Sequence, residues 1–249
     1  LDKFHFSYGR IEARIKAATG AGMWPAFWML GVNSREPDTT WPLCGEIDIM
    51  EVWGDADTEQ FPSSEIFGTI HFGENWPANL YSGEQTRVID GVTYTDFGED
   101  FHVYAIEWDE DGEIRWYFND TLYGTRTYNN ANGEYSDQVN PEYGWGTSAD
   151  PDSMSNNSKA PFDKHFYIIM NLAVGGSSFS GKITNSTLSS TLSSSDPVST
   201  KLSILDSLNA FDGDNALMIV DWVRIYGFEN ETTYTLPEQS SESLTFSSN

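Results

Sequence analysis

The sequence predicts an all-β protein, a sandwich of two antiparallel sheets. Three observations lead to this prediction. Short β-rich runs recur at intervals of roughly 8–12 residues, a spacing typical of sandwiches. Turn-forming pairs such as Asp90-Gly91 and Asp111-Gly112 separate these runs. No amphipathic pattern persists long enough to predict a helix of more than a few turns.

Eight runs are expected to form strands. In chain order they are Gly9–Lys16, Ala26–Leu30, Glu46–Val52, Ile66–His71, His102–Trp108, Ile114–Phe118, Phe166–Leu172 and Leu217–Tyr226. Polar and apolar residues alternate strictly along the first run, which predicts one wet and one buried face. The fifth and sixth runs are rich in aromatic residues and flank Asp111-Gly112, which predicts a β-hairpin.

Length and composition are those of a single domain. The chain has 249 residues, of which 39% are hydrophobic, enough for a sizeable core. No stretch of eighteen apolar residues occurs, so no membrane-spanning helix is expected. We expect one domain over residues 1–238 and a Ser-rich tail over 239–249. The Ser-rich stretch Ser186–Ser207 lies between two strands and is interpreted as a surface loop.

The charge balance excludes several classes of partner. Lys plus Arg number 13 and Asp plus Glu 38, so the net charge is −25. Such a charge repels nucleic acids and anionic membranes. The only cysteine, Cys44, allows neither an internal disulfide nor a thiolate zinc cluster. We expect a monomer.

Four N-x-S/T sequons bear on location, and about three would occur by chance in a chain so rich in Ser and Thr. They are Asn119, Asn156, Asn185 and Asn230. We expect an extracellular, secreted protein.

Three carboxyls in one apolar strand are the strongest chemical signal. Alternation places Glu46 and Asp48 on one face of the strand but would send Glu51 into the core. A β-bulge around Ile49-Met50 would return Glu51 to the face of the other two acids. The alternative is an edge strand whose acids point into water. Four tryptophans nearby argue against that alternative, because aromatic rings beside carboxyls suit carbohydrate chemistry.

Several motifs together resemble glycoside hydrolase family 16, in particular its laminarinase branch. The acidic segment 46–51 matches the E-x-D-x-x-E signature in its bulged form. The other matching segments are 8–14, 23–30, 68–73, 101–108, 171–176 and 220–226. The resemblance implies a concanavalin-like β-jelly-roll sandwich with an open substrate cleft on its concave sheet. It also implies endo-hydrolysis of β-1,3-glucan with retention of anomeric configuration.

The resemblance also implies a role for each carboxyl. Glu46 would be the nucleophile, Glu51 the general acid/base, and Asp48 the residue that tunes their protonation. Distance along the strand alone would have paired Glu46 with Asp48, because retaining enzymes need carboxyls about 5–5.5 Å apart. The bulge is what makes Glu46 and Glu51 a possible pair.

Six further residues are candidates for substrate binding, with a structural role as the alternative for each. They are Trp24, Trp28, Trp41, His71, Trp76 and Asn171. Trp41, just before the acidic strand, is the foremost stacking candidate. The chemistry requires no cofactor. The resemblance suggests a structural calcium bound by the Gly9 carbonyl and Asp221.

The chain departs from the family at its N-terminus. Relatives have about forty or more residues before the Tyr8-Gly9-Arg10 motif, including a strand that closes the sheets, and this sequence lacks them. We expect either a fragment or a fold in which the C-terminal tail replaces that strand. Three other functions stay open: a non-catalytic β-glucan recognition module, a hydrolase of another β-glucan or a galactan such as lichenan or agar, and a transglycosylase.

Overall fold

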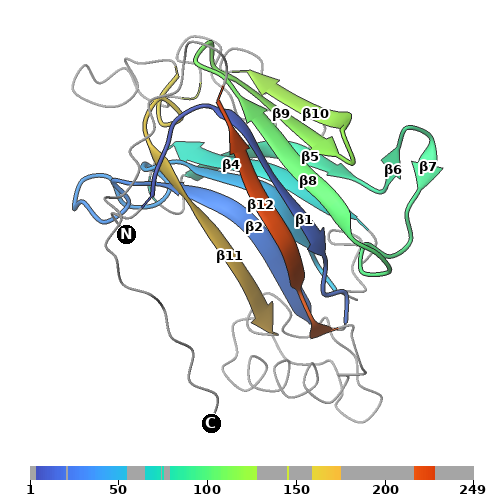
Figure 1. The fold of residues 1–249 in the computed structure, drawn as a ribbon. Coiled ribbons are helices and arrows are strands. Elements are labelled where there is room, and N and C mark those ends of the chain that lie inside the picture. The colour runs from blue at the N-terminus through green and yellow to red at the C-terminus, as the bar shows by residue number, and fades with distance from the viewer. Residues whose placement is uncertain are drawn as a thin grey trace, which may run out of the picture.

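A computed structural model describes residues 4–20, 22–54, 65–73, 75, 79–127, 145, 159–174 and 216–227. These residues form two five-stranded antiparallel sheets packed face to face, with a small two-stranded ribbon at one side (Figure 1). The first sheet contains, in spatial order, β11 (Phe166–Val174), β2 (Met23–Gly31), β3 (Glu46–Val52), β4 (Ile66–Gly73) and β5 (Asn79–Thr86). The predicted all-β sandwich is confirmed.

The second sheet lies against the first. In spatial order it contains β10 (Thr121–Thr127), β9 (Glu113–Phe118), β8 (His102–Trp108), β1 (Gly9–Lys16) and β12 (Ile219–Tyr226). The ribbon pairs β6 (Val88–Ile89) with β7 (Val92–Thr93) around the Asp90-Gly91 turn. Strands far apart in the sequence also lie side by side, since β1 lies between β8 and β12.

The core lies between the sheets and is built by the alternation that the sequence shows. On β9, Ile114, Trp116 and Phe118 are buried, while the residues between them are half-buried. Strands of the other sheet contribute Phe27 and Ile47 to the same cluster. A core so rich in aromatic rings buries much apolar area per residue, which stabilises the sandwich.

Four strands were not predicted: β5, β6, β7 and β10. Strand β10 pairs with β9 at the edge of its sheet, and the turn between them places Asn119 and Asp120 at positive φ (46° and 63°). Asn and Asp tolerate this conformation, so the dipeptide was a usable hairpin signal. Strand β5 is also an edge strand, and its Ser-Gly-Glu centre lacks the apolar pattern of an inner strand.

Some predictions fall outside the described residues. These are Trp76, the Ser186–Ser207 stretch, the tail from residue 239, and the sequons at Asn156, Asn185 and Asn230. Among the described residues, no helix is long and apolar enough to cross a membrane.

Candidate active site

The predicted bulge on β3 is confirmed and brings the three acids together. Toward β2, Asp48 lies opposite Trp28, and Glu51 opposite Ala26. Toward β4, the register shifts between Asp48 and Glu51, so that Ile49 and Met50 occupy the space of a single partner residue. Ile49 and Met50 are both buried in the core. Glu46, Asp48 and Glu51 therefore share the face of the sheet that is turned away from the core.

A tryptophan of the opposite sheet holds this bulge in place. The Trp116 indole is fully buried, and its Nε1 donates a 2.8 Å hydrogen bond to the backbone carbonyl of Asp48. The same ring fills the space beside Gly68, where an added Cβ would lie only 2.3 Å from Trp116 Cδ1. Gly68 stands opposite the bulge on β4, between the partners of Asp48 and Glu51. No local sequence pattern predicts this contact between the sheets.

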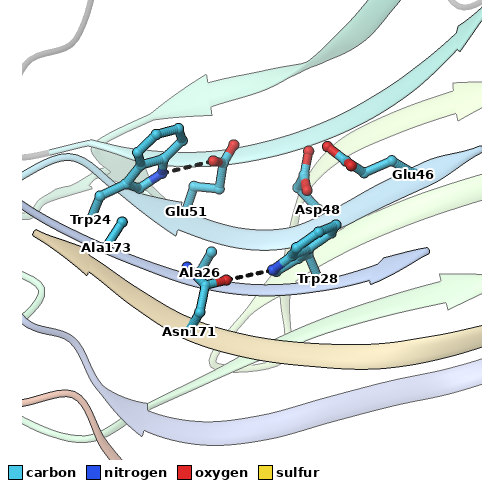
Figure 2. A pocket seen from close by; sticks show the side chains of 8 residues that line it. All are labelled: Trp24, Ala26, Trp28, Glu46, Asp48, Glu51, Asn171 and Ala173. Atoms are coloured by element: carbon cyan, nitrogen blue, oxygen red, sulfur yellow. Dashed lines mark hydrogen bonds between the residues drawn. The ribbon is translucent and has the colours of Figure 1, made fainter. Parts of the chain in front are cut away.

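The three carboxyls open into one cavity of about 220 Å³. Its lining residues are Trp24, Ala26, Trp28, Glu46, Asp48, Glu51, Asn171 and Ala173. Figure 2 shows the three acids in a row along β3, with the two tryptophans on the neighbouring strand β2. Because a water molecule occupies about 30 Å³ in the liquid, the cavity admits a considerably larger group.

Two indole groups on β2 are fixed by hydrogen bonds inside this cavity. Trp24 Nε1 donates to Glu51 Oε1 at 2.8 Å, and Trp28 Nε1 donates to Asn171 Oδ1 at 2.7 Å (Figure 2). Trp24 also stacks on Trp53, with ring centroids 3.9 Å apart. The ring of Trp24 is therefore held on one side by Trp53 and fixes the carboxyl of Glu51 on the other.

Aromatic rings extend the site from Glu46 across β4 to β5. Trp41 is 36% exposed, donates a hydrogen bond to Glu46, and lies with its ring centroid 5.7 Å from that of His71. Tyr81 pairs with His71 across β4 and β5, and their ring centroids are 6.0 Å apart. Tyr81 was missed because its strand was not predicted.

His71 contacts two of the acids. Its Nε2 lies 3.3 Å from Asp48 Oδ2 and 3.7 Å from Glu46 Oε1. The position follows from strand register, because Glu46 on β3 is paired with His71 on β4. The predicted site residues on β2, β3, β4 and β11, together with Trp41, are thus brought to one region of the molecule.

The three carboxyls keep their protons to higher pH than isolated carboxyls do. Burial raises the pKa of Glu46, Asp48 and Glu51, in each case to about 8. The charge of Asp48 raises the pKa of both glutamates further, and nearness to His71 lowers them. Because ionising one carboxyl makes its neighbours harder to ionise, the three carboxyls lose their protons one after another as the pH rises.

Two side chains of chemically reactive types, Cys44 and His102, have no part in the cavity. Burial, followed by the charge of Glu46, raises the pKa of the Cys44 thiol to about 11, so no thiolate is available there at neutral pH. Cys44 is fully buried and acts as a small apolar residue. His102 lies on β8 in the opposite sheet, beside Asn119.

The predicted calcium ligands do not fit one ion. In the β1–β12 pair, Arg10 lies opposite Tyr226 and Arg14 opposite Trp222, so Gly9 and Asp221 are at opposite ends of the pair. Five residues of antiparallel strand span roughly 17 Å, whereas calcium contacts its ligands at about 2.3–2.6 Å. Arg14 Nη1 lies 2.6 Å from Asp221 Oδ2. Gly9 is required for another reason, since a Cβ there would lie 2.3 Å from the carbonyl oxygen of Tyr226.

The chain is similar to a known protein family and to several known proteins. The family model for glycosyl hydrolases family 16 matches residues 2–156. The chain is 40% identical over 184 residues to glucan endo-1,3-beta-glucosidase A1 of Niallia circulans, covering 74% of this chain and 23% of that protein. It is 32% identical to a beta-1,3-glucan-binding protein of Penaeus monodon, covering 92% of this chain and 62% of that protein.

A solved structure shares the architecture. The laminarinase catalytic domain from Thermotoga maritima is 37% identical, with a TM-score of 0.50, over 70% of this chain and 56% of that one. The chain spans less than two thirds of the length of each of these three proteins.

Proposed function

Because the chain belongs to glycosyl hydrolases family 16, we propose that it hydrolyses internal linkages of β-1,3-glucan with retention of anomeric configuration. The observation that supports this most is the row of Glu46, Asp48 and Glu51, which a bulge turns into one cavity beside Trp24 and Trp28. Carboxyls that differ in protonation, next to exposed ring faces, are what glycoside hydrolysis needs.

In the proposed mechanism the two glutamates act in two steps. The ionised carboxylate of Glu46 attacks the anomeric carbon, while the protonated carboxyl of Glu51 gives its proton to the departing glycosidic oxygen. A glycosyl ester on Glu46 results. Glu51, now ionised, then takes a proton from water as that water attacks the anomeric carbon and frees Glu46. Two inversions give net retention.

The surroundings of the two glutamates support this division of work. The N–H of Trp24 fixes one oxygen of Glu51 and leaves the other free to exchange a proton with the leaving group or water. Asp48 and His71 surround Glu46, so a proton can be held between these groups while Glu46 is ionised. Trp41 and Trp28 offer ring faces on which sugar rings can stack.

A second candidate function is recognition of β-1,3-glucan without hydrolysis. It is favoured by the similarity to the Penaeus glucan-binding protein, which extends over 92% of the chain. Hydrolysis is preferred because both glutamates and Asp48 are present and share one cavity. A sulfated galactan is a less suitable substrate, since a net charge of −25 repels a polyanion. The extracellular location and monomeric state stay predictions.

One assay separates these functions. Reducing-sugar release by the purified protein is compared on laminarin, lichenan, agarose and a sulfated galactan at matched salt. We expect laminarin to be turned over fastest, and Glu46→Gln and Glu51→Gln to be at least about 100-fold slower on it. Glu107→Gln, which changes an acid on β8 of the other sheet, is the matched control and should keep its activity.

Two results would contradict the proposal. Turnover of the sulfated galactan equal to that of laminarin would overturn the substrate assignment. Binding of laminarin by calorimetry, with no reducing sugar released from any of the four polysaccharides, would favour the recognition module instead.

A further inference from the structure

One imidazole and two carboxylates converge on the floor of the cavity. Glu46 and Asp48 come from β3, and His71 comes from β4 directly across the strand pair from Glu46. One oxygen from each acid and one ring nitrogen of the histidine all lie within 4.8 Å of one another. These three groups could therefore contact a single small ion at the same time.

The two distances from the histidine nitrogen to the acids are close to those of tetrahedral coordination. A zinc ion holds nitrogen and oxygen ligands at about 2.0–2.1 Å, so two ligands at a tetrahedral angle lie about 3.3 Å apart. His71 Nε2 lies 3.3 Å from Asp48 Oδ2 and 3.7 Å from Glu46 Oε1. Small side-chain movements would bring all three atoms to bonding distance.

The buried side chain of Asp48 gives a second observation, because one of its oxygens accepts no hydrogen bond. The side chain of Asp48 is 5% exposed, and its Oδ2 accepts no hydrogen bond although His71 Nε2 is 3.3 Å away. A buried carboxylate oxygen without a partner is costly. A cation between these residues would satisfy it. The cavity beside Asp48 leaves room for the ion and for water at an open coordination position.

The donor set selects the class of ion. Imidazole with carboxylates suits Zn²⁺ and similar transition metals, whereas Ca²⁺ and Mg²⁺ take six or more oxygen ligands. We propose that Glu46, Asp48 and His71 bind one divalent cation of the Zn²⁺ class, and that this ion excludes the polysaccharide. The second part rests on the proposed function, because the ion would occupy the nucleophile and the cavity that the sugar needs.

Direct titration tests the binding site without any activity measurement. Zn²⁺ is titrated by calorimetry into the chelator-treated chain in buffer free of phosphate, and Co²⁺ absorption reports coordination geometry. We expect one ion per chain and a four-coordinate Co²⁺ spectrum. His71→Gln and Asp48→Asn should each weaken binding at least about 100-fold, since even residues that only support metal ligands contribute 10–100-fold. Glu51→Gln, in the same cavity, and His102→Gln, on the other sheet, should bind like the parent chain.

Several outcomes would overturn the site: no Zn²⁺ binding, unchanged affinity in His71→Gln and Asp48→Asn, or displacement of Zn²⁺ by equimolar Ca²⁺. Competition is tested by the KM for laminarin, which should rise with Zn²⁺ and recover with a chelator. If laminarin is hydrolysed but Zn²⁺ does not bind, this inference fails and the proposed function stands. If Zn²⁺ binds through His71 but no glucan is hydrolysed, the proposed function fails and the metal site stands.

Discussion

At the scale of single residues, two indole N–H groups distinguish the two glutamates. Trp24 donates to Glu51, and Trp41 donates to Glu46. Each hydrogen bond favours the ionised form of its own partner and so lowers the pKa of that carboxyl, against the larger effect of burial. In the proposed mechanism Glu51 acts first as an acid and Glu46 as an ionised nucleophile, so the two tryptophans should control opposite limbs of the pH–rate profile.

The first prediction concerns Trp24→Phe. Loss of the N–H raises the pKa of Glu51, so Glu51 stays protonated to higher pH and the alkaline limb of kcat/KM moves upward. We expect a movement of about one pH unit, since a hydrogen bond to a charged group contributes about 1.5 kcal/mol. Trp28→Phe is the control, because Trp28 donates to Asn171 and to neither glutamate. An alkaline limb that stays in place in Trp24→Phe would contradict the role given to Glu51.

The second prediction concerns Trp41→Phe, which keeps an aromatic ring but removes the donor to Glu46. The pKa of Glu46 rises, so more base is needed to ionise the nucleophile, and the acid limb of kcat/KM moves to higher pH. Trp41→Ala should show the same movement and, in addition, a higher KM because the stacking surface is lost. Unchanged acid limbs in both variants, from pH–rate profiles on laminarin oligosaccharides, would show that Trp41 does not act on Glu46.

At the scale of elements, the bulge on β3 determines whether the site exists. Without it, strict alternation would bury Glu51 in the core. Trp116 on β9 holds the bulge through the carbonyl of Asp48 and occupies the space that a side chain at Gly68 would need. The active face of one sheet therefore depends on a residue in the core of the other.

The third prediction is that Gly68→Ala damages both stability and activity. Its Cβ would lie 2.3 Å from the fully buried Trp116 ring, which cannot move without disturbing the core. Overpacking of this kind costs about 1–3 kcal/mol, and we expect kcat on laminarin to fall at least about tenfold in the fraction that folds. Gly91→Ala is the control: it strains a turn at φ +74° but meets no atom within 4 Å, so activity should be kept. Full activity in Gly68→Ala would mean that the bulge tolerates displacement of Trp116.

Strand β3 could be predicted from the sequence in full, whereas the neighbouring edge strand and the contact that holds the bulge could not. Strand β3 has the predicted bounds and bulge, because three acids in an apolar run admit few arrangements. Strand β5 was missed because an edge strand needs no apolar pattern, and Tyr81 was missed with it. The contact of Trp116 with Gly68 joins different sheets, and no local pattern reports it. The calcium prediction was wrong in its ligand pair because it ignored strand register.

At the scale of the whole molecule, the buried carboxyls reduce stability at neutral pH. The pKa of Asp48 is about 8 in the folded protein, against an ordinary value of 3.8. Below about pH 4 the group is protonated in both states. Above it, the unfolded chain releases a proton that the folded chain keeps, so the stability of the folded state falls as the pH rises toward 8. The raised pKa of this buried carboxyl therefore costs folding free energy at neutral pH.

The fourth prediction is that Asp48→Asn gains stability relative to the unmodified chain as the pH rises from 4 to 8, because Asn does not titrate. Denaturant unfolding across this range measures the difference. Glu107→Gln is a control in which stability should change in the opposite direction. Burial raises the pKa of Glu107, but hydrogen bonds from Tyr117 and Arg115 outweigh burial, so the pKa is lowered overall. Glu107→Gln should therefore lose relative stability as the pH rises. A difference between Asp48→Asn and the parent chain that does not change with pH would contradict the raised pKa.

In the proposed mechanism Glu46 forms a covalent bond to the sugar while Glu51 transfers the proton. The most direct test is to trap the intermediate with a 2-fluoro-laminaribioside that carries an activated aryl leaving group, and to map the labelled peptide by mass spectrometry. We expect one adduct per chain, located on Glu46 and absent in Glu46→Gln, but still formed in Glu51→Gln because this leaving group needs no proton. An adduct on Asp48 or Glu51, or an inverted product from laminarin with no adduct, would contradict it.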